Sequence, residues 1–139
     1  MSATVTTTPD STTAVAAFVR FLETNVPPEG LFAPDVFGDI SLPTWRLQAE
    51  SAEELVAIRV GGHPIVGTVH VTRVEPTPRG FTMEFHERWE DGGQQWYCRE
   101  MARADVVGST IVELAIYCTG DWDEACVSQH ASAVRLARP

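Results

Sequence analysis

The chain has 139 residues, a length that fits one globular domain. Apolar residues make up 44% and charged residues 21%, and the formal net charge is −9 at pH 7. The ten basic residues are all arginine and form no cluster, which argues against nucleic acid or an anionic membrane surface as a partner. The exclusive use of arginine suggests a GC-rich, bacterial genome. No apolar stretch is long enough to span a bilayer.

The three cysteines are an odd number without a C-x-x-C pair, so neither a disulfide framework nor a zinc site is expected. We therefore expect a protein of the reducing cytoplasm that uses no metal and no cofactor. The Ser/Thr-rich start lacks the basic and then apolar order of a secretion signal. Residues 1–10 are predicted to be a disordered tail, and residues 11–139 one folded domain.

Apolar periodicity predicts two early helices and then a long run of strands. The segment Asp10-Ser11-Thr12 is typical of a helix N-cap, and Ser51 to Glu54 forms a capping box. The expected helices cover about 11–24, 52–60 and 121–131. Stretches rich in Val, Thr and aromatic residues predict strands at about 36–40, 65–75, 81–90, 95–104 and 110–118. The order of helix, strand, helix and four antiparallel strands indicates an α+β fold.

The segment Asp91-Gly92-Gly93-Gln94 is typical of a two-residue hairpin loop, which fixes the register of its two strands. One face of the hairpin is then mostly apolar and should meet the helices and any pocket. That face carries Phe81, Met83, Phe85, Glu87, Trp89, Trp96, Cys98, Glu100, Ala102 and Ala104, and the next strand adds Val112, Leu114, Ile116 and Cys118. The residues expected to line a pocket are Phe85, Trp89, Trp96, Cys98, Leu114, Ile116 and Cys118, with Trp45 and Trp122 at its mouth.

Three carboxylates are candidate catalytic groups. Glu87 and Glu100 lie diagonally across adjacent strands on the apolar face, where burial raises a carboxyl pKa and suits a general acid or base. The alternative is that they lie at the rim of the sheet or pair with Arg46 or another buried arginine. Asp39, at an apolar strand end, is the third candidate; its alternative is a turn or cap residue before Pro43.

Three further polar residues are possible auxiliary groups. Arg46 follows Trp45 in an aromatic cluster, and Asp121 would either orient a base or cap the last helix. His130, on that helix, would either reach the sheet or lie in the core or on the surface. His63 precedes Pro64 in a loop, and no His, Asp or Glu spacing matches a metal site.

The segment from Phe32 to Asp39 and the order of elements resemble the SnoaL-like and ketosteroid-isomerase members of the nuclear transport factor 2-like superfamily. There an aromatic residue, a small residue, acidic residues and an apolar strand precede a functional acid. The resemblance covers about residues 12–130. It implies a cone-shaped, curved antiparallel sheet packed on N-terminal helices (a cystatin-like roll), a pocket at the open end and usually a homodimer. It also places Asp39 where the isomerases carry their proton-shuttling base.

The chain departs from two members of this superfamily. The isomerases take an oxyanion-hole tyrosine from the first helix, where this chain has only Phe18 and Phe21. The limonene epoxide hydrolases use an Asp-Arg-Asp trio. The segment from Glu87 to Glu90 resembles their Arg-plus-acid strand, but their third acid would fall near Ile116. That match would also place Arg88 and Glu90 in the pocket, against the face assignment.

Two functions of different kinds follow. The first is an enzyme without a cofactor that moves protons on an apolar or aromatic oxygenated metabolite, as an isomerase, polyketide cyclase, dehydratase or epoxide hydrolase of secondary metabolism. The second is a non-catalytic module with the same fold, for small-molecule binding or dimeric assembly. Its main feature would be the polar sheet face, where Tyr97, Met101 and Tyr117 lie among charges.

Overall fold

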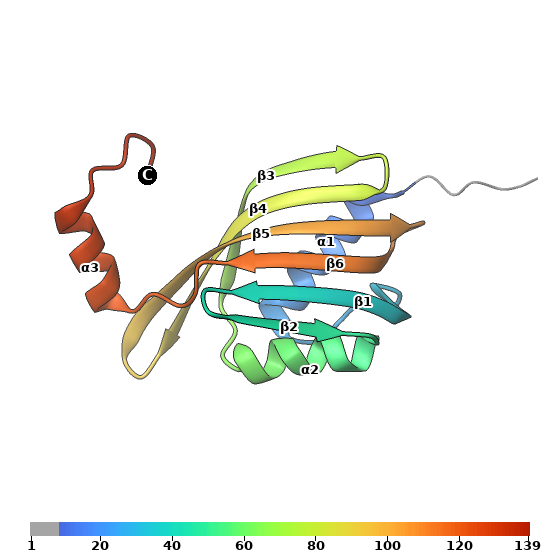
Figure 1. Cartoon of the computed structure of the whole chain (residues 1–139), viewed down its shortest axis with the longest axis horizontal. Helices are drawn as coiled ribbons and strands as arrows, with labels where there is room; N and C mark the ends of the chain where they lie inside the picture. Colours follow the sequence, from blue (N-terminus) through green and yellow to red (C-terminus); the bar gives the residue numbers. More distant parts are fainter. Residues whose placement is uncertain (1–8) are drawn as a thin grey trace, which may run out of the picture.

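A six-stranded curved sheet forms the centre of the molecule (Figure 1), seen in a computed structural model that describes residues 9–139. Of the tail predicted at 1–10, residues 1–8 therefore lie outside the described residues. The helices are α1 (Ser11–Thr24), α2 (Ala52–Gly62) and α3 (Glu124–Ala133). The strands are β1 (Phe32–Leu42), β2 (Trp45–Ala49), β3 (Thr68–Thr77), β4 (Gly80–Asp91), β5 (Gln94–Val107) and β6 (Thr110–Cys118).

The strand order is β2-β1-β6-β5-β4-β3. The α+β prediction is confirmed, but the sheet is mixed rather than wholly antiparallel, because β1 runs parallel to β6. The first strand extends over 32–42 instead of 36–40, and the extended stretch after it forms an antiparallel hairpin with it as β2.

Both early helices begin at the residues that the sequence indicated. The Asp10 carboxylate accepts a hydrogen bond from the Thr13 amide at 3.0 Å, and α1 ends at Asn25, whose φ of 60° is left-handed. The Ser51 hydroxyl likewise accepts from the Glu54 amide at the start of α2. These caps fix where each helix starts and so which of its side chains meet the sheet.

The β4–β5 hairpin has the predicted register, from Asp91 opposite Gln94 to Phe81 opposite Ala104. The prediction fails one strand further on. An irregularity between Asp105 and Val106 shifts the β5–β6 pairing, so Ile111 is fully buried and Val112 is not. From Leu114 to Cys118 the expected face is confirmed, because Leu114 lies opposite Ala104 and Cys118 opposite Glu100.

The hydrophobic core lies between the apolar face of the sheet and helices α1 and α2. Phe18 of α1 packs edge-on against Phe85 of β4, with ring centroids 6.3 Å apart. Helix α2 lies along the β1–β2 edge, whereas α3 stands apart near the β4–β5 hairpin tip and contributes no buried residue (Figure 1). Among the described residues no helix is both long and apolar enough to cross a membrane.

Gly80, at the start of β4, permits the close approach of β4 and β5. A Cβ atom there would collide with the Ala104 carbonyl oxygen, which is backbone and cannot turn away. We predict that Gly80→Ala lowers the free energy of unfolding by about 1–3 kcal/mol, a typical cost of overpacking. Urea denaturation followed by circular dichroism measures it.

The matched control is Gly61→Ala in α2, where an added Cβ meets nothing within 4 Å. Alanine should leave stability unchanged or raise it by up to about 1 kcal/mol, because it is the better helix former. Equal effects of the two substitutions would show that the β4–β5 approach at Gly80 is not tightly packed.

Candidate functional site

A cavity of about 590 Å³ lies between α2 and the inner face of the sheet. Most of its wall is apolar, formed by side chains such as Leu22, Ile40, Leu55 and Ile116. Polar groups also line it, and these are Arg59, His63, Cys98, Glu100, Cys118 and Asp121. An apolar wall with a few polar groups is the usual form of a small-molecule site.

A buried ion pair stands beside this polar group of residues. The Glu87 carboxylate, only 3% exposed, accepts hydrogen bonds from both terminal nitrogens of Arg59 at 2.7 and 2.9 Å. Burial raises the pKa of Glu87, but the hydrogen bonds from Arg59 outweigh it and hold the pKa below its ordinary value. Arg59 also donates to the Leu22 carbonyl at 2.7 Å and to the Asn25 side chain at 3.1 Å. The pair thus joins the end of α1, the end of α2 and strand β4.

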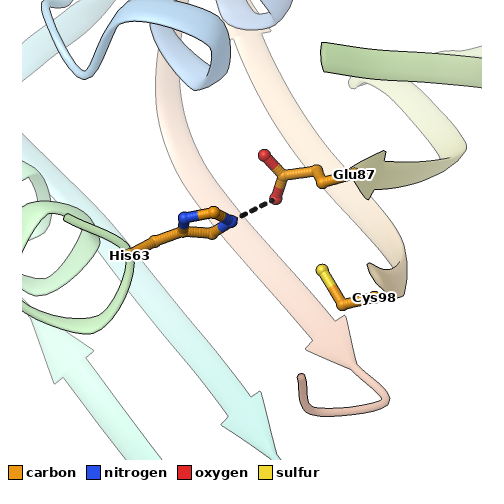
Figure 2. Close-up of side chains that lie close together, drawn as sticks. All are labelled: His63, Glu87 and Cys98. Carbon is orange, nitrogen blue, oxygen red and sulfur yellow. Dashed lines mark ion pairs between the residues drawn. The ribbon is translucent and has the colours of Figure 1, made fainter. Parts of the chain in front are cut away.

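His63, directly after α2, points its ring at Glu87 (Figure 2). Its Nδ1 lies 2.8 Å from the Ile65 carbonyl oxygen, which can only accept, so Nδ1 carries the proton. In the neutral ring Nε2 is then an acceptor. It is buried without a hydrogen-bond partner, 3.8 Å from Glu87 Oε2. Burial, helped by the positive charge of Arg59, lowers the pKa of His63, so Nε2 is a free base.

Glu100 is the second buried polar group without a full set of partners. Its Oε2 atom is buried and makes no hydrogen bond. Burial, then a hydrogen bond to Glu87 and the charge of that carboxylate, raise the pKa of Glu100 well above its ordinary value. A neutral carboxyl of this kind can donate a proton or a hydrogen bond to an oxygen atom in the cavity.

Two thiols lie next to these groups. Cys98 Sγ, Cys118 Sγ and a carboxyl oxygen of Glu100 lie within 4.8 Å of one another. Cys98 Sγ also lies within 4.8 Å of a ring nitrogen of His63 and a carboxyl oxygen of Glu87. The hydrogen bond with Cys118, together with burial, raises the pKa of Cys98, so this sulfur is a neutral thiol.

Asp39 and Arg46 lie outside the cavity, which corrects the prediction that they belong to the site. Arg46 donates two hydrogen bonds to Asp39, at 2.8 and 2.6 Å, and these lower the pKa of Asp39. Side chains alternate along a strand, and Ile40 lines the cavity, so Asp39 faces the other side of β1. Asp39 is therefore an ion-paired residue of the outer sheet face.

The predicted pocket residues divide into three groups. Cys98, Ile116 and Cys118 line the cavity as predicted. Trp89 and Trp96 instead line a smaller cavity of about 120 Å³, which His63 and Asp121 also line. The remaining four do not line either cavity: Phe85 and Leu114 are buried in the core, Trp45 is 67% exposed, and Trp122 contacts Tyr97 and His130.

The two candidates near the C-terminus, Asp121 and His130, differ in their position relative to the cavities. Asp123, not Asp121, caps α3, because its carboxylate accepts from the Cys126 amide at 2.8 Å. Asp121 lines both cavities, and burial raises its pKa. His130 lies on α3 with its ring 5.1 Å from that of Trp122, and it lines neither of the two cavities.

Sequence reasoning did not select Arg59 or His63. The one signal for Arg59 was the alternative that a buried glutamate pairs with a buried arginine, and Arg59 stands in the last turn of α2. His63 follows Gly61-Gly62, which indicates only a helix end. Its role depends on its position beside Glu87 of β4, which no local sequence pattern indicates.

No protein-family model and no curated protein matches this chain. Solved structures do. An LEH-like epoxide hydrolase from M. tuberculosis superposes with a TM-score of 0.61 at 14% identity, over 79% of this chain and 85% of that one. A protein with a ketosteroid isomerase-like fold from Catenulispora acidiphila gives 0.60 at 17% identity, over 76% and 85%. A nuclear transport factor 2-like protein from Anabaena variabilis gives 0.58 at 16%, over 78% and 85%.

At these identities the comparisons establish the fold. The chain has the nuclear transport factor 2-like fold, as the resemblance in the sequence implied. Similarity of fold alone does not identify the chemistry of the site.

The Arg59–Glu87 pair gives a test of how the site is held. Arg59→Met should lower the free energy of unfolding by about 3–5 kcal/mol, because it leaves a buried carboxylate without its partner. The double variant Arg59→Met/Glu87→Leu should recover most of that loss. Chemical denaturation of the two single variants and the double variant completes the thermodynamic cycle.

The control is Asp39→Asn, which removes the exposed pair with Arg46 and should change stability little. Additive losses in the double variant would contradict a coupled buried pair.

Proposed function

We propose that this protein is a cofactor-independent enzyme that transfers protons on an apolar, oxygenated small molecule. The observation that carries the proposal is an unpartnered base nitrogen and an unpartnered carboxyl oxygen at one cavity. His63 Nε2 and Glu100 Oε2 are both buried, and neither has a hydrogen-bond partner. Such atoms normally find partners inside proteins, and a ligand in the cavity that both residues line would supply them after a small movement of the side chains.

The two groups are close enough to act on one molecule. A ring nitrogen of His63 and a carboxyl oxygen of Glu100 each lie within 4.8 Å of Cys98 Sγ. We assign to His63 Nε2 the removal of a proton from carbon beside a carbonyl group, and to Glu100 a hydrogen bond or proton to the carbonyl oxygen. Return of the proton to another carbon completes an isomerisation.

The Arg59–Glu87 pair has a positioning role in this scheme. Proton uptake turns His63 into an imidazolium, and the Glu87 carboxylate 3.8 Å away stabilises that charge. Arg59 keeps Glu87 ionised and directed at the ring. Glu87 is therefore not assigned as the base, because both its oxygens already accept hydrogen bonds from Arg59.

The same acid and base would also serve the related reactions that the sequence suggested, namely cyclisation, dehydration and epoxide opening. Structural neighbours include an epoxide hydrolase and a ketosteroid isomerase-like protein, which supports acid–base chemistry as a class. We take proton transfer next to a carbonyl as the primary reaction, because a base and an acid with separate targets are what it requires.

We predict that His63→Ala and Glu100→Gln each lower kcat by about 10²–10⁴-fold, the usual contribution of general acid–base groups. The assay follows conversion of an apolar β,γ-unsaturated ketone to its conjugated isomer by ultraviolet absorbance, with a terpene epoxide as a second probe. Affinity for the conjugated product, measured by calorimetry, should change far less than kcat.

The matched control is Asp39→Asn, which removes a carboxylate outside the cavity and should keep full activity. Full turnover by both site variants would rule out the assigned roles. Binding of the probes by the wild-type protein without any turnover would favour the non-catalytic module.

The module alternative, and the expected homodimer, rest on the outer sheet face. Met101 and Tyr117 lie opposite each other on β5 and β6 and are 45% and 63% exposed. We propose that this face pairs two copies of the chain. Light scattering should give the mass of a dimer for the wild-type protein and of a monomer for Tyr117→Glu; a wild-type monomer would contradict the pairing.

A further inference from the structure

Cys98, Glu100 and Cys118 form a compact group of possible metal ligands on the cavity wall. The sulfur atoms of the two cysteines and a carboxyl oxygen of Glu100 lie within 4.8 Å of one another. All three residues line the 590 Å³ cavity. We call this group the Cys98–Glu100–Cys118 cluster.

The sheet itself holds the cluster together. Cys98 and Glu100 are two positions apart on β5, so their side chains share one face. Cys118, the last residue of β6, lies directly opposite Glu100. Three ligand atoms therefore come from paired backbone, which fixes their spacing far better than a loop would.

The two thiols are hydrogen-bonded to each other, and a disulfide between them does not fit the strand geometry. Cys118 pairs with Glu100, so Cys98 and Cys118 are diagonal neighbours, and such positions place Cα atoms roughly 7–8 Å apart. A disulfide spans Cα separations of only about 4.4–6.8 Å. A zinc ion with bonds of about 2.3 Å to each sulfur holds tetrahedral thiolates roughly 3.8 Å apart, which needs little movement of the strands.

The Glu100 carboxyl, which the proposed function also uses, supplies a second observation. Its Oε2 atom is buried and has no hydrogen-bond partner. Two sulfurs and one carboxylate are a donor set that favours a thiophilic divalent cation over Mg²⁺ or Ca²⁺, which prefer oxygen ligands.

The geometry points to a zinc-binding site formed by Cys98, Cys118 and Glu100, with a fourth coordination position open to the cavity. Three protein ligands and one open position are the arrangement of zinc ions that contact small molecules. Two thiolates and the Glu100 carboxylate carry three negative charges against the two positive charges of the ion, so the occupied site would have a net charge of −1, close to the positive charge of Arg59. No sequence motif indicates this site, because its ligands come from two strands without a recognised spacing.

The neighbouring group of His63, Glu87 and Cys98 is the weaker candidate (Figure 2). The side chains converge, but both Glu87 oxygens accept hydrogen bonds from the Arg59 guanidinium. A cation bound to Glu87 would lie beside that positive charge. The two groups share only Cys98, so variants can tell them apart.

This inference goes beyond the proposed function and does not rest on it. A zinc ion on Glu100 would occupy the carboxyl that we assign as the acid. If both proposals hold, Zn²⁺ therefore inhibits the proton transfer. Zinc binding is measured without any substrate, so each proposal can fail alone.

The experiment uses untagged, reduced, chelator-treated full-length protein. Titration with Zn²⁺ by calorimetry should give one site, and Co²⁺ as a spectroscopic probe should show the ultraviolet charge-transfer band of thiolate ligands. Cys118→Ser and Glu100→Gln should each weaken Zn²⁺ binding at least about tenfold, since even loss of an outer-shell partner can cost that much. Cys118 is only partly buried, so its serine variant should fold, as thermal unfolding would verify.

Two variants serve as controls. Cys126→Ser removes the third thiol, which lies outside the cluster, and should bind Zn²⁺ as the wild-type protein does. His63→Ala should also keep its Zn²⁺ affinity while losing turnover, which separates the two proposals. Absence of Zn²⁺ binding, unchanged binding by folded Cys118→Ser and Glu100→Gln, or loss of binding in His63→Ala would overturn the assigned ligand set.

Discussion

The buried ion pair between Arg59 and Glu87 is the interaction on which the site depends. The hydrogen bonds of Arg59 go to three residues in two places: the Leu22 carbonyl and Asn25 at the end of α1, and Glu87 on β4. Buried ions are costly unless their hydrogen-bonding positions are satisfied, and here four of the five N–H groups of the guanidinium donate a hydrogen bond. The pair therefore fixes how the two N-terminal helices sit against the sheet beside the cavity.

The same pair sets the electrostatics of its neighbours. The charge on Arg59 disfavours a protonated His63, while the Glu87 carboxylate disfavours a second negative charge on Glu100. One buried salt bridge thus works together with burial to keep a base and an acid both in their uncharged forms. Without Arg59, burial would raise the pKa of Glu87. Glu87 and Glu100 would then no longer differ in charge.

Features set by residues close together in the sequence were predicted correctly, whereas features set by the packing of distant segments were not. The hairpin register followed from Gly92-Gly93 alone, and it correctly placed Glu87, Cys98 and Glu100 on the inner face. The shift after Asp105 did not follow, because a bulge is set by the fit of neighbouring strands rather than by a turn motif.

Asp39, in contrast, was assigned to the site although it lies outside it. Its apolar neighbours and a family resemblance made it a candidate, but strand alternation turns it to the outer face, where Arg46 neutralises it. Arg59 and His63 were missed for a complementary reason. A helix-end arginine and a histidine in a loop are usually solvated, and only the packing of α2 against β4 buries them beside Glu87.

The unpartnered polar atoms of the site lower the stability of the folded protein, which favours a role in binding a ligand. A buried polar atom without a partner costs roughly 1–3 kcal/mol, a noticeable part of the stability of a domain of this size. His63 Nε2 and Glu100 Oε2 both carry that cost beside an apolar cavity that a few larger side chains would fill. A core selected for stability alone would replace these groups, as stabilising substitutions at functional sites commonly do at the expense of activity. Their presence on two different elements, at one cavity, is what a site for an oxygenated ligand or a metal ion requires and what a purely structural core does not.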